Sequence, residues 1–592
     1  MKTRKPPTPK PAESKMDFTR RDFLKATSVA LSGGLMVPQH ATAATEATGT
    51  LQVEIRDGAT KEVVPAMVCI TSLADRKWRT PPDGRTSPPY TTTHDFYEGL
   101  PSWKPGDVGP VRVTAGDYHN NNIRSGVYGG KSAYPFWKEP ATYFVSKPFS
   151  IILPAGKWRL AVARGIEYRP VFEEFEIAQD ETLDRKILLR RWVNMPKLGW
   201  YSGDDHVHMV RVTPNQNELL MTWTRAEDVH VSNILRMGDP NRTYFEQEGY
   251  GEHYRYQHGD HVLASGQEDP RMHISGQGHA IGLNLKAPVR DVSRYRLYDV
   301  VFDGIHAQGG LAGYAHLAWA RQLAQQASPR EQVYAVWDAT INVVRNKVDF
   351  LEILQFRMLG LKDYYDFLNL GFKLTASAGT DLPWGNTIGE VRMYAHTGPD
   401  FSADAWFAAM KEGRTFVTNG PMLTVTADGA IPGDELKVHR NRRVRIRVRA
   451  WAPESIGSPK TLEVISQGRV IHSAESRNPG QHELKIDLQL KAEESQWIAA
   501  RVKSHNGALA HTSPLYVLVN GESFRNQKEL PQLVKYRMEV LDYIAGRLRD
   551  PQFVTSEAYR ESQVKAFSQE LEDARERYRQ LLASDPKDQT SG

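Results

Sequence analysis

The sequence is poor in cysteine: Cys69 is the only one among 592 residues. A single thiol excludes an internal disulfide framework, a zinc site built from thiolates and an iron–sulfur cluster. Cys69 lies in the apolar run 67–70, which indicates a core residue and not a nucleophile. The 19 histidines are therefore the ligands to expect if the protein holds a metal.

Long hydrophobic runs are absent as well. No stretch of about 20 apolar residues occurs, so we expect no membrane span after processing. The sequence also lacks the glycine-rich phosphate loop of the Walker type and the Gly-x-Ser-x-Gly elbow of serine esterases. These absences argue against nucleotide hydrolysis on a phosphate loop and against serine-based ester cleavage.

A surplus of charge is missing from most of the chain, although the formal net charge is +5. Residues 1–43 contain eight basic and three acidic side chains, and the remaining residues contain 67 of each. A neutral body lacks the basic patch that binding to a phosphate backbone requires. We therefore expect no nucleic-acid partner.

Residues 1–43 have the pattern of a twin-arginine signal peptide. The pair Arg20-Arg21 precedes a short apolar run, 26–37, and the small residues 41–43 form a cleavage site. The prediction is a periplasmic or otherwise extracytoplasmic protein that is exported by the twin-arginine machinery.

The rest of the chain predicts a multidomain α/β plus β fold. Short alternating strands predict a β-sandwich over 47–195, in which the turn 153–158 resembles that of carboxypeptidase-regulatory-like domains. Strand-like and helix-like segments alternate over 196–420, which indicates parallel strands. A second β-sandwich is expected over 421–520 and a helical tail over 521–592, where an apolar stripe at helical spacing predicts packing on the body.

The strongest local motif is the segment 200–208, which ends in His206-Val207-His208. Residues two apart on a strand point the same way, so both imidazoles can hold one cation. Asp204 shares that side and is expected to accept a hydrogen bond from an imidazole N–H.

Four later motifs each place a potential ligand beside small residues, at or near the end of an apolar run. They are Gly266-Gln267-Glu268, Gly278-His279, Ala315-His316 and Gly379-Thr380-Asp381. Catalytic residues of α/β barrels lie at such strand ends. Several imidazoles together with two carboxylates suit Zn, Mn or Fe better than Mg or Ca.

The order of these motifs resembles the PHP (polymerase and histidinol phosphatase) metal-hydrolase superfamily. The flanking segments 200–204 and 413–421 are similar, more narrowly, to CehA/McbA-type metallohydrolases. The resemblance covers 196–425 and implies a distorted (β/α)7 barrel with metals at one mouth, flanked here by the two β-sandwiches.

The resemblance also implies how the metals are held. One metal would lie on His206, His208, Glu268 and Asp381, and a second on Glu268, His279 and His316, so that Glu268 bridges them. The family's third metal needs histidines where this sequence has Pro214, Pro240 and Pro383. We therefore expect a binuclear centre, or a mononuclear one if the second position is weak.

Such a centre predicts an exported hydrolase that uses a metal-activated water on an ester, phosphoester, amide or carbamate bond. Asp381 and Glu268 are the expected catalytic residues, with Asp381 accepting the proton of the water. Further candidates for contact with substrate or ligands are Arg236, Asp239, Asn241, Glu352 and Arg392. The alternative is a cell-envelope protein that binds a glycan or peptide, with a degenerate barrel and a structural metal only.

Overall fold

The structure is a computed structural model. It describes residues 47–79, 81, 143–239, 242–271, 278–291, 297–317, 336, 338–382, 385, 387–549 and 557–583. The predicted signal peptide and Pro240, Asn241 and Pro383 lie outside the described residues.

The N-terminal region consists of two small sheets. In the first, β1 (Thr48–Asp57) lies between β5 (Phe149–Pro154) and β8 (Thr182–Leu189). In the second, β2 (Ala66–Ser72) pairs with β3 (Trp78–Arg79), β4 (Tyr143–Val145) and β6 (Gly156–Ala163), and β6 pairs with β7 (Val171–Ile177). Alternate residues of both sheets are buried in one shared apolar core, which is the arrangement of a β-sandwich.

The central region is built on seven strands that neighbour one another in the order β9, β10, β13, β14, β15, β16, β18. β14 is antiparallel to both of its neighbours, and the other pairs in this series are parallel. An isolated parallel bridge joins Val207 to Leu382, so the segment after β18 returns to the end of β9. The strands are β9 (Trp200–Val207), β10 (Val231–Asp239), β13 (His261–Glu268), β14 (Ala280–Leu283), β15 (Leu311–Tyr314), β16 (Phe350–Gln355) and β18 (Thr375–Ala378).

Short strands and helices accompany these strands. β11 (Arg242–Tyr244), β12 (Tyr256–His258) and β17 (Met358–Leu359) pair antiparallel with β10, β13 and β16. Strand β16 is buried at all six positions, as expected for a strand that is covered on both faces. The helices of this region are α4 (Pro214–Ala226), α5 (Asp299–Ala307), α7 (Ala339–Asn342), α8 (Leu361–Asn369) and α9 (Ala403–Lys411), with 3-10 turns at Pro196–Leu198 and Glu252–Tyr254.

The central and C-terminal β regions share hydrogen-bonded strands. β19 (Arg392–His396) pairs with β9 and with β20 (Thr415–Thr418), and β20 pairs with β28 (Leu509–Thr512). The same sheet continues through β27 (Gln496–Ser504), β24 (Pro459–Ser466), β25 (Arg469–Glu475), β29 (Leu515–Val519) and β22 (Glu435–Val438). A separate sheet of β21 (Met422–Ala427), β23 (Arg442–Trp451) and β26 (Glu483–Ala492) contributes to the same core.

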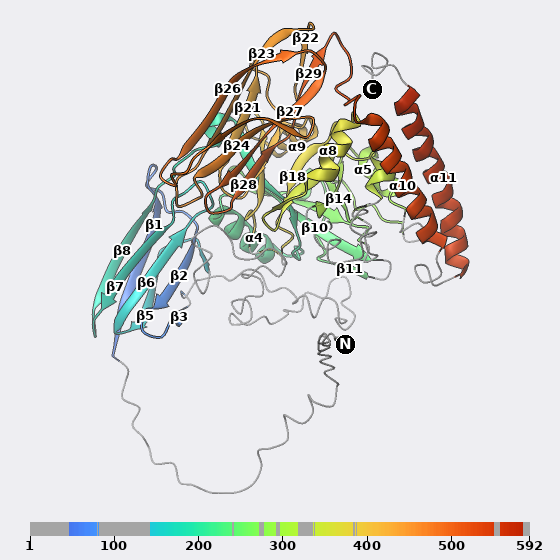
Figure 1. The fold of residues 1–592 in the computed structure, drawn as a ribbon. Helices are drawn as coiled ribbons and strands as arrows, with labels where there is room; N and C mark the ends of the chain where they lie inside the picture. The colour runs from blue at the N-terminus through green and yellow to red at the C-terminus, as the bar shows by residue number, and fades with distance from the viewer. Residues whose placement is uncertain are drawn as a thin grey trace, which may run out of the picture. The chain divides into compact units, whose positions relative to one another are not determined.

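The chain ends in two helices, α10 (Leu530–Arg549) and α11 (Glu557–Ala583), which lie side by side (Figure 1). The apolar stripe expected in the tail is buried from Phe567 to Leu581 and belongs to the core of the central strands. Tyr578 donates to the carbonyl oxygen of Thr340 at 2.8 Å, which ties α11 to α7. None of the helices in the described ranges combines the length and apolar character needed to cross a bilayer.

Candidate metal centre

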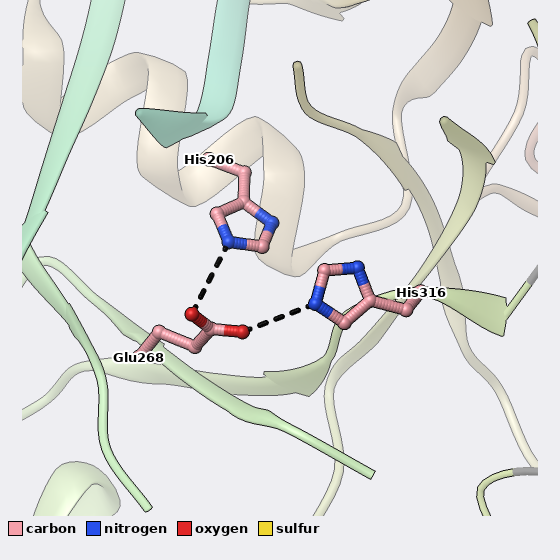
Figure 2. A group of neighbouring side chains, drawn as sticks. All are labelled: His206, Glu268 and His316. Carbon is pink, nitrogen blue, oxygen red and sulfur yellow. Dashed lines mark hydrogen bonds and ion pairs between the residues drawn. The ribbon is translucent and has the colours of Figure 1, made fainter. Parts of the chain in front are cut away.

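The side chains that the sequence singled out as metal ligands meet in the central region. They come from β9 and the residue after it, from the end of β13, and from the segments beside β14, β15 and β18. Two groups of three have ligand atoms that all lie within 4.8 Å of one another, and both are buried. The groups are His206, His208 and Asp381, and His206, Glu268 and His316; Figure 2 shows the second.

The two histidines of the His-x-His motif have fixed ring orientations. The Nδ1 of His206 donates to Glu352 Oε2 at 2.8 Å, and the Nδ1 of His208 donates to the carbonyl oxygen of Leu235 at 3.1 Å. In neutral rings both Nε2 atoms are then bare acceptors, and they lie 2.9 Å apart. Two lone pairs facing each other at this distance repel unless a proton or a cation lies between them.

Glu268 lies between two pairs of imidazoles. Its Oε2 is 3.1 Å from His208 Nε2 and 3.6 Å from His206 Nε2. Its Oε1 is 2.5 Å from His279 Nδ1 and 3.2 Å from His316 Nε2. This is the geometry that a bridging carboxylate requires, because each oxygen has its own pair of nitrogen neighbours.

Asp381 completes the first group. Its Oδ1 lies 3.4 Å from His206 Nε2 and 3.5 Å from His208 Nε2. Among the described residues, Asp381 Oδ1 and Glu268 Oε2 are buried oxygens that accept no hydrogen bond. Buried carboxylate oxygens without donors are costly, so these atoms fit a bound cation. The donor set therefore fits a transition metal.

Two of these residues have strained backbones. His316 has φ 68° and Asp381 has φ 52°, a region that side chains other than glycine seldom adopt. Such strain costs on the order of 1–3 kcal/mol per residue and is typical of functional sites. The His316 ring is also held, since its Nδ1 donates to Gln355 Oε1 at 2.9 Å.

The buried charges stabilise one another. Burial alone would raise the pKa of Glu268, but His279 and His206 outweigh it and hold that pKa well below its usual range. Burial lowers the pKa of His279 to about 4, although the neighbouring Glu268 opposes this shift. Burial also opposes protonation of His206, but Asp381, Glu352 and Glu268 raise its pKa well above the usual value.

Asp204 does not hold an imidazole, contrary to the expectation from the two-residue spacing. Its oxygens accept from the backbone N–H groups of His206 (3.1 Å), Thr380 (3.0 Å) and Gly389 (2.8 Å) and from the Thr380 hydroxyl (2.5 Å). The partner of His206 is Glu352 instead. The strand register shifts between Ser232 and Ile234, opposite this part of β9, so strict alternation does not hold here.

The predicted substrate contacts have different outcomes. Arg392 is fully buried and donates to the carbonyl oxygens of Gly389 (2.7 Å), Glu227 (3.2 Å) and Asp228 (3.4 Å), so it holds these backbone segments together. Arg236 donates to Asp269 Oδ2 at 2.8 Å, beside Glu268 in the sequence. Asp239 is the last residue of β10, and only its backbone is described.

Sequence reasoning predicted Glu352 but missed two other residues that position the candidate ligands. Gln355 orients His316, and the buried carboxyl of Asp338 accepts from Gly278 N–H (2.8 Å) and the Tyr314 hydroxyl (2.9 Å), just before His279. Burial raises the pKa of Asp338 to about 7. No motif marks these residues, because they act through partners that are distant in the sequence.

An apolar cluster lies next to the centre. The Phe245 ring is 5.3 Å from that of His208, and Phe245 packs with Met237, Tyr244 and Phe356. The sequence did not predict this cluster. The segment 244–261, which contains Phe245, is rich in tyrosine and histidine and reads equally well as a surface loop. It supplies the apolar wall that excludes water from one side of His208.

Comparison with known proteins adds little. No family model matches this chain, and no curated protein matches it. Among solved structures, one match is the crystal structure of an engineered protein that is 16% identical. The alignment covers 17% of this chain and 20% of that chain, with a TM-score of 0.12. A match of this extent indicates neither a fold nor a function.

Proposed function

We propose that this protein is a metal-dependent hydrolase of the PHP type, most similar to CehA/McbA-type enzymes. The observation that carries the proposal is the position of Glu268, whose two oxygens each approach a different pair of imidazoles. A single structural cation would need only one such pair. The proposed centre is therefore binuclear, with Zn, Mn or Fe.

The residues divide into two ligand sets around Glu268. His206, His208 and Asp381 would hold one metal, and His279 and His316 the other. When bound, the metals would supply Lewis acidity and lower the pKa of a water molecule. Asp381 would bind its metal through Oδ1, which lies near His206 and His208, and its other oxygen, Oδ2, would take the proton of that water. Glu352 keeps His206 in the tautomer that ligates through Nε2.

Three features support the PHP-type barrel and the loss of a third metal. The seven central strands neighbour one another in one series, and the Val207–Leu382 bridge brings its ends together. The ligands lie at or beyond strand ends, as in α/β barrels. Pro214 begins α4 and has no side-chain donor for a metal.

The proposed substrate bond is an ester, phosphoester, amide or carbamate in a small molecule, a glycan or a peptide. The proposed compartment is the periplasm, reached by the twin-arginine route. The second candidate function is a binding protein in the cell envelope with a structural metal. Burial favours it, since even His279 has a side chain only 14% exposed.

Metal analysis and hydrolysis on the same preparations separate the two functions. The full chain should carry about two transition metals and cleave chromogenic esters or phosphoesters. His316→Ala should lose mainly one metal together with the activity, whereas the control His472→Ala, on the exposed strand β25, should lose neither. A metal-loaded chain that hydrolyses no member of the panel would favour the binding protein.

A further inference from the structure

The solvent face of β23 carries a row of arginines. The strand alternates between buried apolar residues (Val444, Ile446, Val448, Ala450) and exposed arginines (Arg443, Arg445, Arg447, Arg449). β23 is the middle strand of its sheet, between β21 and β26 (Figure 1). The row therefore runs along the centre of a sheet face.

The strand register shows which side chains flank the row. On β26, Lys491 lies opposite Arg443, Asp487 opposite Arg447 and Lys485 opposite Arg449. On β21 the positions opposite Arg447 and Arg449 are threonines. The face, named here the arginine face, thus holds six cations, and the acids in contact with it are four, namely Asp428, Asp487, Glu483 and Glu493. It is net positive by two charges, although the chain after residue 43 is neutral.

The acids pair closely with two of the four arginines, and the other two have no close counter-ion among the described residues. Arg445 donates to both oxygens of Asp487, at 2.8 and 2.5 Å, and Arg449 donates to Glu483 at 2.5 Å. Arg447 approaches only the already occupied Asp487, at 3.8 Å, and is 59% exposed. Arg443 makes no ion pair within the described ranges. Two oriented guanidiniums therefore alternate with two that lack a close counter-ion.

The distance between successive arginines of the row indicates what shape of ligand could bind to it. Alternate residues of a strand are about 6.8 Å apart, so the four arginines extend over roughly 20 Å. The planar guanidinium binds carboxylate and sulfate groups through two parallel hydrogen bonds. A straight row of such groups matches a linear polymer that carries anions at regular intervals.

Other polyanions fit this face less well. None of the exposed large hydrophobic side chains in the described ranges lies on β21, β23 or β26, so nothing there would insert into a lipid surface. The face also presents no exposed aromatic ring on which nucleic-acid bases would stack.

We propose that the arginine face binds a linear anionic polysaccharide. This binding site goes beyond the proposed hydrolytic function and does not depend on it, because it involves none of the residues of the metal centre.

The test uses the full chain and two probes, polygalacturonate and dextran sulfate, with neutral dextran as the uncharged control. The double variant Arg443→Gln with Arg447→Gln should raise the Kd for the anionic probes by about tenfold or more and weaken the salt dependence of binding. The matched control removes two exposed arginines from α11, Arg577→Gln with Arg579→Gln, and should leave the Kd unchanged.

Three results would overturn the proposal: no binding of either anionic probe at low salt, equal weakening in both double variants, or tighter binding of anionic vesicles or single-stranded DNA. Thermal melting of each variant checks that the sheet is intact. Metal content and hydrolysis should be the same in all variants, so this test fails separately from that of the hydrolase.

Discussion

Two buried clusters of charge in this protein differ in how their carboxylates are neutralised. Near the N-terminal region, Asp228 Oδ1 accepts from Arg164 and Arg191, both at 3.1 Å. Glu167 accepts from Arg191 (2.6 Å), from the backbone N–H of Met195 (3.0 Å) and from the hydroxyl of Tyr394 (3.0 Å). Burial raises the pKa of Asp228, but Arg191 and Arg164 outweigh it and hold that pKa below its usual range.

The centre around Glu268 has no such arginine. Within the described residues, every ion pair of Glu268, Glu352 and Asp381 is with an imidazole. Imidazoles are neutral when their ring nitrogens act as ligands, so these carboxylates lack a permanent positive charge from the chain. The carboxylates of the first cluster are therefore neutralised by arginines of the chain, whereas those of the second lie among imidazoles in an arrangement that could hold a metal ion.

The largest effect should follow from Glu268→Gln. An amide keeps the volume but removes the charge between the two imidazole pairs, so both metals should be lost and kcat/KM should fall by about 10³-fold or more, equivalent to about 4 kcal/mol. Metal content and rate are measured on the same preparation. Full metal together with full rate would show that Glu268 is an ordinary strand-end carboxylate.

Arg191→Ala should lower the stability of the fold and leave the metal content unchanged. It leaves Glu167 and half of the Asp228 contacts without their cation, and breaking a buried ion pair costs about 3–4 kcal/mol of unfolding free energy. Denaturant unfolding should reveal this loss equally with and without a chelator. If the metal content fell while the stability stayed the same, the two clusters would not be independent.

Glu227 is a third kind of buried carboxyl, because a bound proton is expected to neutralise it in place of an arginine or a metal. It accepts from the Thr387 hydroxyl at 2.6 Å, and burial raises its pKa to about 8. The native state then holds a proton that the unfolded state releases above about pH 4.5, so stability should fall as the pH rises from about 4.5 to 8. Glu227→Gln should remove this slope.

The gain from Glu227→Gln should be about 4 kcal/mol at pH 8 and close to zero at pH 4. Thermal melting at the two pH values measures it against the unchanged chain. A variant with the pH slope of the unchanged chain would mean that Glu227 is ionised in the folded protein.

The smallest effect should come from Glu352→Gln, which acts through His206. The amide oxygen can still accept from Nδ1, but a neutral acceptor makes the ring a weaker ligand, and metal affinity should fall by about tenfold. Competition with a chelator of known affinity measures this. Glu352→Asp should lower affinity further, because the shorter side chain no longer reaches Nδ1; equal affinity in all three chains would remove Glu352 from the site.

The sequence predicted side chains that the structure brings together in clusters that could hold a metal ion, but it did not predict their surroundings. His206 and Glu268 lie at the ends of buried strands and Asp381 lies just after one, which is a local pattern. The role of Asp204 depends on a register shift, and that of Arg392 depends on burial against a distant loop. Gln355 and Asp338 act on histidines that are 39 and 59 residues away in the chain.

The strand pair β20–β28 joins the central region and the C-terminal β region in one hydrogen-bonded sheet. Residues near 417 and 511 are joined by main-chain hydrogen bonds, although the sequence separates them into different domains. Removal of the C-terminal β region would therefore remove β28 from the sheet that contains β9 and His206. The N–H and C=O groups along that edge of β20 would then lack hydrogen-bond partners. The central and C-terminal regions should consequently melt in one cooperative transition, and a protease that cuts between them should not release two folded fragments.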